Sequence, residues 1–194
     1  MSVFCLIDRS GSMASCADDT IGGFNTFIKN QPSNTMISLS LFDHEIKHVY
    51  TKVANDVEPL DHTTFVPRGS TALLDAIGKV IKSVPHGTVK PIIMILTDGL
   101  ENSSRVYTKM HINDLITEKR LYEWEFIFLA ANQDAIQAAG EIGIPEMSAL
   151  SFNTDNVKNA FRSVSAAVGR KRTGDTQTVQ FSQDERMEST GSCV

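Results

Sequence analysis

Short apolar runs alternate along the chain with segments in which apolar residues recur at helical spacing. Residues 3–7 and 92–96 are continuous apolar runs, which is typical of strands buried on both faces of a sheet. Residues 36–42 instead alternate apolar and polar positions, as expected for a strand. The same criteria predict three further strands, over 47–53 at an antiparallel edge, 126–131 and 147–152.

Helical periodicity fills the intervals between these strands. It is clearest over residues 73–84, where apolar positions form one stripe that Pro85 and Gly87 end. The other helices are expected around 21–28, 112–116, 135–142 and 157–168. Strands alternating with helices predict an α/β domain, with a Rossmann-like, doubly wound, mostly parallel sheet and helices on both faces. Ligands of such sheets bind beyond the carboxyl ends of the strands.

The length of 194 residues is that of one domain, and the periodic pattern covers residues 1–169. Residues 170–194 are rich in polar side chains and lose the periodicity. We therefore expect a domain over 1–169, followed by a polar, flexible C-terminal tail over 170–194.

Charge and cysteine usage narrow the classes of partner. The net charge is −5 and the densest basic run is only residues 170–172, which argues against nucleic acid. No segment approaches the roughly 20 apolar residues of a membrane helix. The three cysteines, Cys5, Cys16 and Cys193, form no C-x-x-C pair, and no signal peptide is visible. These features predict a cytoplasmic protein without a membrane or nucleic-acid partner.

Candidate chemistry begins directly behind the first apolar run, at Asp8, Ser10 and Ser12. In a roughly extended chain, residues two apart point to the same side, so one carboxylate and two hydroxyls converge. Oxygen donors of this kind suit a hard cation such as Mg²⁺, and the absence of histidine and cysteine disfavours zinc. Taken alone, the three residues are better explained by a turn in which Asp8 caps and the serines satisfy backbone donors.

Two further segments change that balance. Thr71 precedes the clearest helix, and Asp98 directly follows the second buried run. Together with Asp8, Ser10 and Ser12 they give the order D-x-S-x-S…T…D. This pattern resembles the metal-ion-dependent adhesion site (MIDAS) of von Willebrand factor A (VWA) domains over residues 1–169, and residues 70–77 look like the stand-alone prokaryotic and phage versions.

The resemblance implies a VWA fold and a set of metal ligands. Ser10 and Ser12 would bind the ion directly, and Thr71, Asp8 and Asp98 would bind it directly or through water. Mg²⁺ is the expected ion, with Mn²⁺ or Ca²⁺ possible. Two carboxylates balance its charge while neutral hydroxyls leave it electrophilic, so an Asp or Glu of a partner protein is expected to complete the coordination.

This resemblance predicts a non-enzymatic, Mg²⁺-dependent protein-interaction module. Prokaryotic relatives often work beside ATPases or within multi-protein complexes. This chain contains no G-x-x-x-x-G-K-[ST] loop, so such an ATPase would be a separate chain.

Two alternatives stay open from the sequence. One is a metal-dependent phosphatase or other hydrolase with Asp8 or Ser10 as nucleophile, although no G-x-S-x-G elbow, general base or placed lysine supports it. The other is a self-associating structural protomer, in which Glu185 or Glu188 of one copy enters the site of the next.

Several other polar residues have simpler interpretations. Asp75 is expected to form local hydrogen bonds in the loops, and Glu101 and Asn102 to lie in a solvated loop. His44 and His48 lie four apart, but in a turn and a strand, so they are expected to be solvated rather than to bind zinc.

Overall fold

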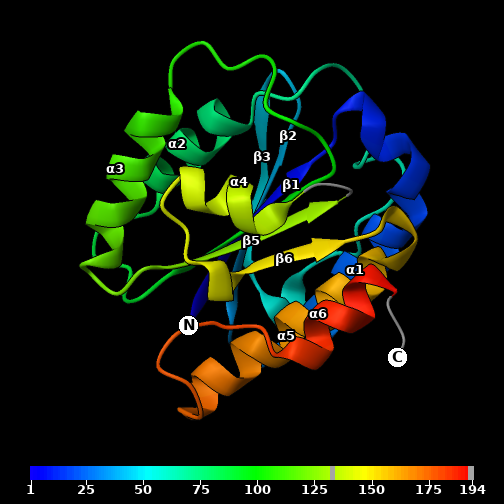
Figure 1. Ribbon diagram of the computed structural model, residues 1–194. Helices are drawn as coiled ribbons and strands as arrows, with labels where there is room; N and C mark the ends of the chain where they lie inside the picture. Colours follow the sequence, from blue (N-terminus) through cyan, green and yellow to red (C-terminus); the bar gives the residue numbers. More distant parts are fainter. Residues whose placement is uncertain (132–133, 192–194) are drawn as a thin grey trace.

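The computed structural model describes residues 1–131 and 134–191. Within these residues, six strands form one sheet in the order β3-β2-β1-β4-β5-β6 (Figure 1). All neighbouring strands are parallel except β2 and β3, which are antiparallel. The strands are β1 (Ser2–Asp8), β2 (Met36–Phe42), β3 (Ile46–Val53), β4 (Ile92–Thr97), β5 (Glu125–Ala131) and β6 (Ala149–Phe152). The predicted mostly parallel sheet with an antiparallel edge is confirmed.

Helices cover both faces of the sheet (Figure 1). One core lies between the sheet and the pair α1 and α5, and the other lies under α2, α3 and α4. The helices are α1 (Ala17–Lys29), α2 (Leu73–Ser83), α3 (Lys109–Arg120), α4 (Ala135–Glu141), α5 (Val157–Thr173) and α6 (Gln183–Thr190). Short 3₁₀ turns are η1 (Gly11–Cys16), η2 (Ala54–Asp56), η3 (Glu146–Ser148) and η4 (Thr154–Asn156). The predicted doubly wound fold class is therefore correct.

The central strands are continuous apolar runs because each supplies both cores. In β1, Val3 and Cys5 point into the core under α1 and α5, whereas Phe4 and Leu6 point into the other. Strand β4 alternates in the same way. Strand order reverses at β1, which has β2 on one side and β4 on the other. In this class of sheet, that reversal opens a crevice at the carboxyl ends of the strands, where β1 ends at Asp8 and β4 at Thr97.

The C-terminal segment differs from its prediction. Helix α5 runs on to Thr173, so the expected boundary at residue 169 falls inside a helix. Val179 and Phe181 are buried in the core, and α6 packs against α5 and β6. The prediction of a flexible tail is therefore wrong for residues 170–191. Although the segment is mostly polar, its two buried apolar side chains, Val179 and Phe181, attach it to the core.

Two further observations concern the cysteines and the helices. Cys5 and Cys16 are free and buried, and Cys193 lies outside the described residues. Among residues 1–131 and 134–191, the structure has no helix with the length and hydropathy needed to cross a bilayer.

Candidate metal site

Asp8, the last residue of β1, is fully buried and held from two directions. Its Oδ1 accepts a hydrogen bond of 2.6 Å from the backbone N–H of Ser10. Its Oδ2 accepts one of 2.6 Å from the hydroxyl of Thr97, at the end of β4. Thr97 was not singled out from the sequence, although it directly precedes Asp98. The contact fixes the ends of the two central strands to each other.

Ser10 and Ser12 are brought together by a turn rather than by an extended chain. The backbone is extended at Ser10, but the 3₁₀ helix η1 begins at Gly11, so the predicted extended spacing ends there. The two serine Oγ atoms nevertheless lie 3.2 Å apart. The Ser12 hydroxyl also donates a hydrogen bond of 2.7 Å to Oδ1 of Asp98. The turn thus links the first and last segments of the predicted motif.

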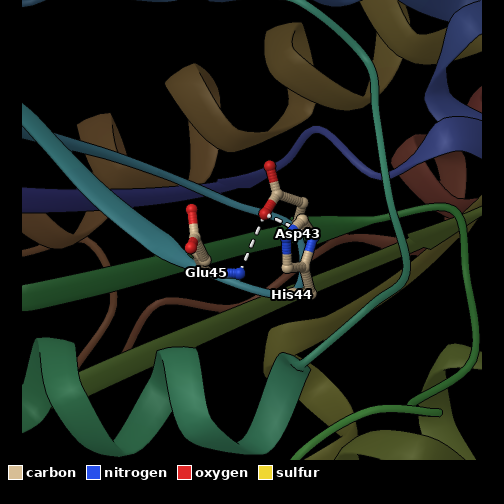
Figure 2. A group of neighbouring side chains, drawn as sticks. All are labelled: Asp43, His44 and Glu45. Carbon is tan, nitrogen blue, oxygen red and sulfur yellow. Dashed lines mark hydrogen bonds and ion pairs between the residues drawn. The ribbon is translucent and has the colours of Figure 1, made fainter.

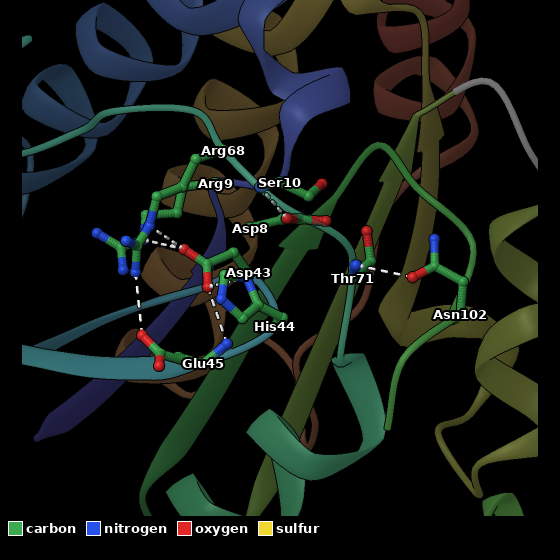
Figure 3. A network of polar contacts seen from close by, with 9 residues as sticks. All are labelled: Asp8, Arg9, Ser10, Asp43, His44, Glu45, Arg68, Thr71 and Asn102. Atoms are coloured by element: carbon green, nitrogen blue, oxygen red, sulfur yellow. Dashed lines mark hydrogen bonds and ion pairs between the residues drawn. The ribbon is translucent and has the colours of Figure 1, made fainter. Parts of the chain in front are cut away.

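Thr71 completes the group from the loop before α2. Its backbone N–H donates to Oδ1 of Asn102 at 2.9 Å (Figure 3), and its carbonyl accepts from the N–H of Asn102. The surroundings of Gly99 show how close the side chains of Thr71, Ser12 and Asp8 lie to one another. A Cβ built there would be 3.1 Å from Oγ1 of Thr71, 3.5 Å from Oγ of Ser12 and 3.9 Å from Oδ2 of Asp8. The structure therefore gathers Asp8, Ser10, Ser12, Thr71 and Asp98 around one small space.

The charges of this space are negative and uncompensated. Among the described side chains, neither Asp8 nor Asp98 forms an ion pair with a basic residue. Burial raises the pKa of Asp8 to about 6, and hydrogen bonds from Thr97 and Ser10 only partly oppose it. Burial raises the pKa of Asp98 as well. The buried carboxylate of Asp8 and the half-buried carboxylate of Asp98, beside three hydroxyls, match the oxygen donors that a small hard cation requires.

A second polar cluster lies next to the candidate metal site and centres on Asp43. Asp43 is fully buried after β2, and its Oδ2 lies 3.0 Å from Nε of Arg9 and accepts a hydrogen bond of 2.9 Å from Nε of Arg68 (Figure 3). The Arg9 contact is an ion pair without hydrogen-bond geometry. Burial opposes ionisation of Asp43, but the N–H of Glu45, the hydrogen bond from Arg68 and both guanidinium charges hold its pKa below the usual value.

This cluster joins the loops that carry the predicted ligands. Arg9 itself stands between Asp8 and Ser10, and its carbonyl accepts from the N–H of Arg68 at 2.8 Å. The N–H of Ala72 donates to the carbonyl of Asp43 at 2.9 Å. We call Arg9, Asp43 and Arg68 the arginine clamp. The sequence alone does not predict the clamp, because its contacts join residues that lie far apart in the chain.

Asp43, His44 and Glu45 also place three potential metal-ligand atoms within 4.8 Å of one another (Figure 2). One oxygen of Asp43 faces both guanidinium groups of the clamp, and the other accepts the N–H of Glu45 and lies 3.2 Å from Nδ1 of His44. Two fixed positive charges on one carboxylate disfavour a cation there. We therefore interpret this group as part of the ion-pair network, and not as a second metal centre.

The remaining polar residues have structural partners. Asp75 accepts hydrogen bonds from three backbone N–H groups of residues 105–107, as predicted. Glu101 is not simply solvated, since its carboxylate accepts from the N–H of Leu74 in the first turn of α2 and from Ser104. Asn102, expected in the same solvated loop, bonds Thr71. The two histidines have different partners. Nε2 of His48 lies 3.3 Å from the hydroxyl of Thr51, whereas Nδ1 of His44 lies 3.2 Å from Oδ1 of Asp43.

The arrangement of the sheet has clear counterparts among solved structures. A von Willebrand factor type A structure from Catenulispora acidiphila aligns with a TM-score of 0.60 at 14% identity, over 86% of this chain and 42% of that one. The chain has the von Willebrand factor A fold. Neither a protein-family model nor a curated protein sequence matches it.

Two other VWA structures extend the comparison. The vWF domain of Mfa5, the type V pili tip protein of Porphyromonas gingivalis, aligns with a TM-score of 0.69 at 11% identity, over 94% of this chain and 97% of that one. Proximal thread matrix protein 1 from the mussel byssus, with a zinc-occupied MIDAS motif, gives a TM-score of 0.62 at 14% identity, over 84% and 44%. This chain spans less than half the length of several of the proteins it matches. At such identities the likeness establishes the fold.

Proposed function

We propose that this VWA domain is a Mg²⁺-dependent protein-interaction module. The observation that carries the proposal is the convergence of five oxygen-bearing side chains beside Gly99. Within residues 1–131 and 134–191, neither of the two carboxylates forms an ion pair with a basic side chain. Asp8, Ser10, Ser12, Thr71 and Asp98 would hold the ion. Oxygen-only donors favour a hard cation, so Mn²⁺ or Ca²⁺ are the expected substitutes.

The bound ion would supply an electrophilic position for an anionic ligand. Asp8 and Asp98 balance its two charges, and the three hydroxyls add none. A third anionic ligand, the Asp or Glu of a partner protein, would therefore be attracted without a fixed excess of negative charge. The VWA fold itself, found in a pilus tip protein among others, supports a role in binding. A cytoplasmic location and an ATPase or multi-protein complex as partner remain predictions.

The contacts of Asp8 and of the C-terminal acids weigh against one form of each alternative. A nucleophilic Asp8 is disfavoured because the side chain is fully buried and both oxygens accept hydrogen bonds. Self-association through the C-terminal acids is disfavoured because Glu185 pairs with Arg170 and Glu188 with Arg162. Both acids stabilise the packing of α6 on α5.

Calorimetric titration of Mg²⁺ and Mn²⁺ tests the proposal. We expect one site in the native chain and none in Asp98→Ala, which removes a carboxylate but leaves the buried end of β1 intact. Repeating the titration with millimolar acetate should tighten ion binding, because acetate stands in for the partner carboxylate. Absence of binding with and without acetate would refute the metal site.

Gly99→Ala is the matched variant for this titration, because it removes no ligand. Its methyl group would lie 3.1 Å from Oγ1 of Thr71 and 3.5 Å from Oγ of Ser12, two of the proposed ligand atoms. We expect metal affinity to fall at least about tenfold with an unchanged circular dichroism spectrum. Gly140→Ala in α4, where an added Cβ would have no heavy atom within 4 Å, serves as the glycine control. Equal affinities in native and Gly99→Ala proteins would place the ion elsewhere.

Metal affinity should depend on pH in the acidic range. Burial raises the pKa of Asp8 to about 6, so below that value the metal-free site holds a proton that the ion must displace. We expect affinity to be constant above about pH 7 and to fall by up to ~tenfold per pH unit below 6. Titrations at pH 5 and 7.5, in buffers of different ionisation enthalpy, measure both affinity and proton release. Equal affinity at the two pH values would contradict the role of Asp8.

A further inference from the structure

A cavity of about 260 Å³ opens beside the candidate metal site, between α2, α4 and the segment that follows β4. Its walls include the buried side chains of Leu73, Leu74 and Phe128. Gly99 also lines it, and the same residue lies against the hydroxyls of Thr71 and Ser12. The cavity and the metal site are therefore neighbours, and Gly99 lies between them.

The charged groups that line this cavity already have partners within the chain. The carboxylate of Glu101 accepts from the backbone at the start of α2, and that of Asp134 caps α4 by accepting from two N–H groups. Lys109 forms an ion pair with Glu141. Because these charges are satisfied, the cavity offers a ligand mainly its apolar walls.

Leu100 marks the edge of this cavity. It follows Gly99 directly, lines the cavity and is 71% exposed. An exposed leucine at the rim of a concave apolar surface enlarges the apolar area that a ligand can bury there. Leu100 is thus placed to cover an apolar side chain that enters the cavity from the metal side.

We propose that the partner segment carries a large apolar side chain, such as Leu, Met or Phe, one or two residues from the acid that binds the metal. The inference rests on the proposed function and adds the chemistry of the partner. The metal selects a carboxylate, and the adjoining cavity selects the apolar neighbour. Three carboxylates, those of Glu101, Asp134 and Glu141, and one lysine line the cavity. Their hydrogen bonds satisfy the carboxylates locally but leave the lining with a negative net charge, which disfavours a second acid in the partner. An extended peptide advances about 3.3 Å per residue, which suits two subsites separated by Gly99.

Short synthetic peptides test this inference in the Mn²⁺-loaded full chain. The probes are acetylated, amidated hexapeptides of Gly and Ser that contain Asp alone, Asp next to Leu, Asp two residues from Leu, or Asn in place of Asp next to Leu. We expect at least one of the two Asp and Leu peptides to bind at least about tenfold more tightly than the peptide with Asp alone. The Asn peptide should not bind.

Variants locate the effect. Leu100→Ser should remove most of the advantage given by Leu, and Leu121→Ser, an equally exposed leucine at the end of α3, should keep it. Titration with Mn²⁺ alone separates the two proposals. If Mn²⁺ binds but Leu gives no advantage, or the advantage survives Leu100→Ser, the inference is overturned and the metal site stands. If Mn²⁺ binds neither alone nor with millimolar acetate, both proposals fall.

Discussion

Asp8→Asn should abolish metal binding and at the same time stabilise the metal-free protein. The folded-state pKa of Asp8, about 6, lies above the ordinary 3.8 because the carboxylate is buried. Its contribution to stability is therefore fully present below about pH 3.8 and lost as the pH rises through 6. A pKa displaced by about two units corresponds to ~3 kcal/mol, so removing the charge at pH 7.5 should recover about 2 kcal/mol.

The asparagine can keep the local hydrogen bonds. Its Oδ1 can accept from the N–H of Ser10, and its Nδ2 can donate to the Thr97 hydroxyl, which can then donate to the carbonyl of Gly99 at 3.1 Å. Thermal unfolding in EDTA at pH 7.5 should show a Tm higher by about 5 °C than that of the native chain. Added Mn²⁺ should raise the Tm of the native chain and leave that of Asp8→Asn unchanged.

Asp75→Asn is the matched control of opposite sign. Burial opposes the ionisation of Asp75, but three backbone N–H groups outweigh it and lower its pKa, so its charged form stabilises the fold. We expect this variant to lose stability at pH 7.5 and to keep its metal affinity. A metal-free Asp8→Asn protein that is less stable than the native chain, or that still binds Mn²⁺, would show that Asp8 is a structural capping residue.

Much of the fold was predictable because its signals are local. A central strand such as β1 contributes side chains to both cores. Its burial on both faces is therefore visible in the sequence as an unbroken apolar run. The stripe of α2 is equally plain, because the opposite side of this helix faces solvent. Each element is thus encoded within about ten residues, and the alternation of the two types fixes the class of fold.

The C-terminal segment could not be predicted in the same way. Its burial depends on Val179 and Phe181, two apolar residues without periodic neighbours. Arg170 binds Glu185 through two hydrogen bonds, and this contact spans 15 residues. Two isolated apolar residues and one ion pair form no periodic pattern, so the sequence of this segment resembles that of a solvated tail.

In the candidate site, too, the residues next to patterned elements were predictable, and those defined by long-range contacts were not. Its five predicted residues were identifiable because each follows or precedes a strongly patterned element, and the structure brings them together. Thr97 and the arginine clamp were not identifiable, because their contacts join residues 25 to 89 positions apart. The folded chain shows that Arg9 pairs with Asp43, so that none of the described basic side chains forms an ion pair with Asp8 or Asp98.

Asp43→Asn should cost about 3 kcal/mol of stability, because it leaves the guanidinium of Arg9 buried without a counter-charge. Arg9 has only 8% of its side chain exposed and cannot regain its hydration without moving the loop between Asp8 and Ser10. Since this loop and that of Thr71 both bond to the clamp, we also expect metal affinity to fall about tenfold. Chemical denaturation and Mn²⁺ titration, each on protein that is still folded at 15 °C, measure the two effects.

Glu45→Gln is the control for the clamp. Glu45 meets the half-exposed guanidinium of Arg68 at the surface, so its loss should change stability and metal affinity little. The double variant Arg9→Gln, Asp43→Asn separates charge from position, because it removes the buried ion pair as a unit. If the clamp only balances charge, the double variant should recover both stability and metal affinity. If it also orients the loops, stability should recover while metal affinity stays low. Native stability and affinity in Asp43→Asn alone would show that the clamp serves neither purpose.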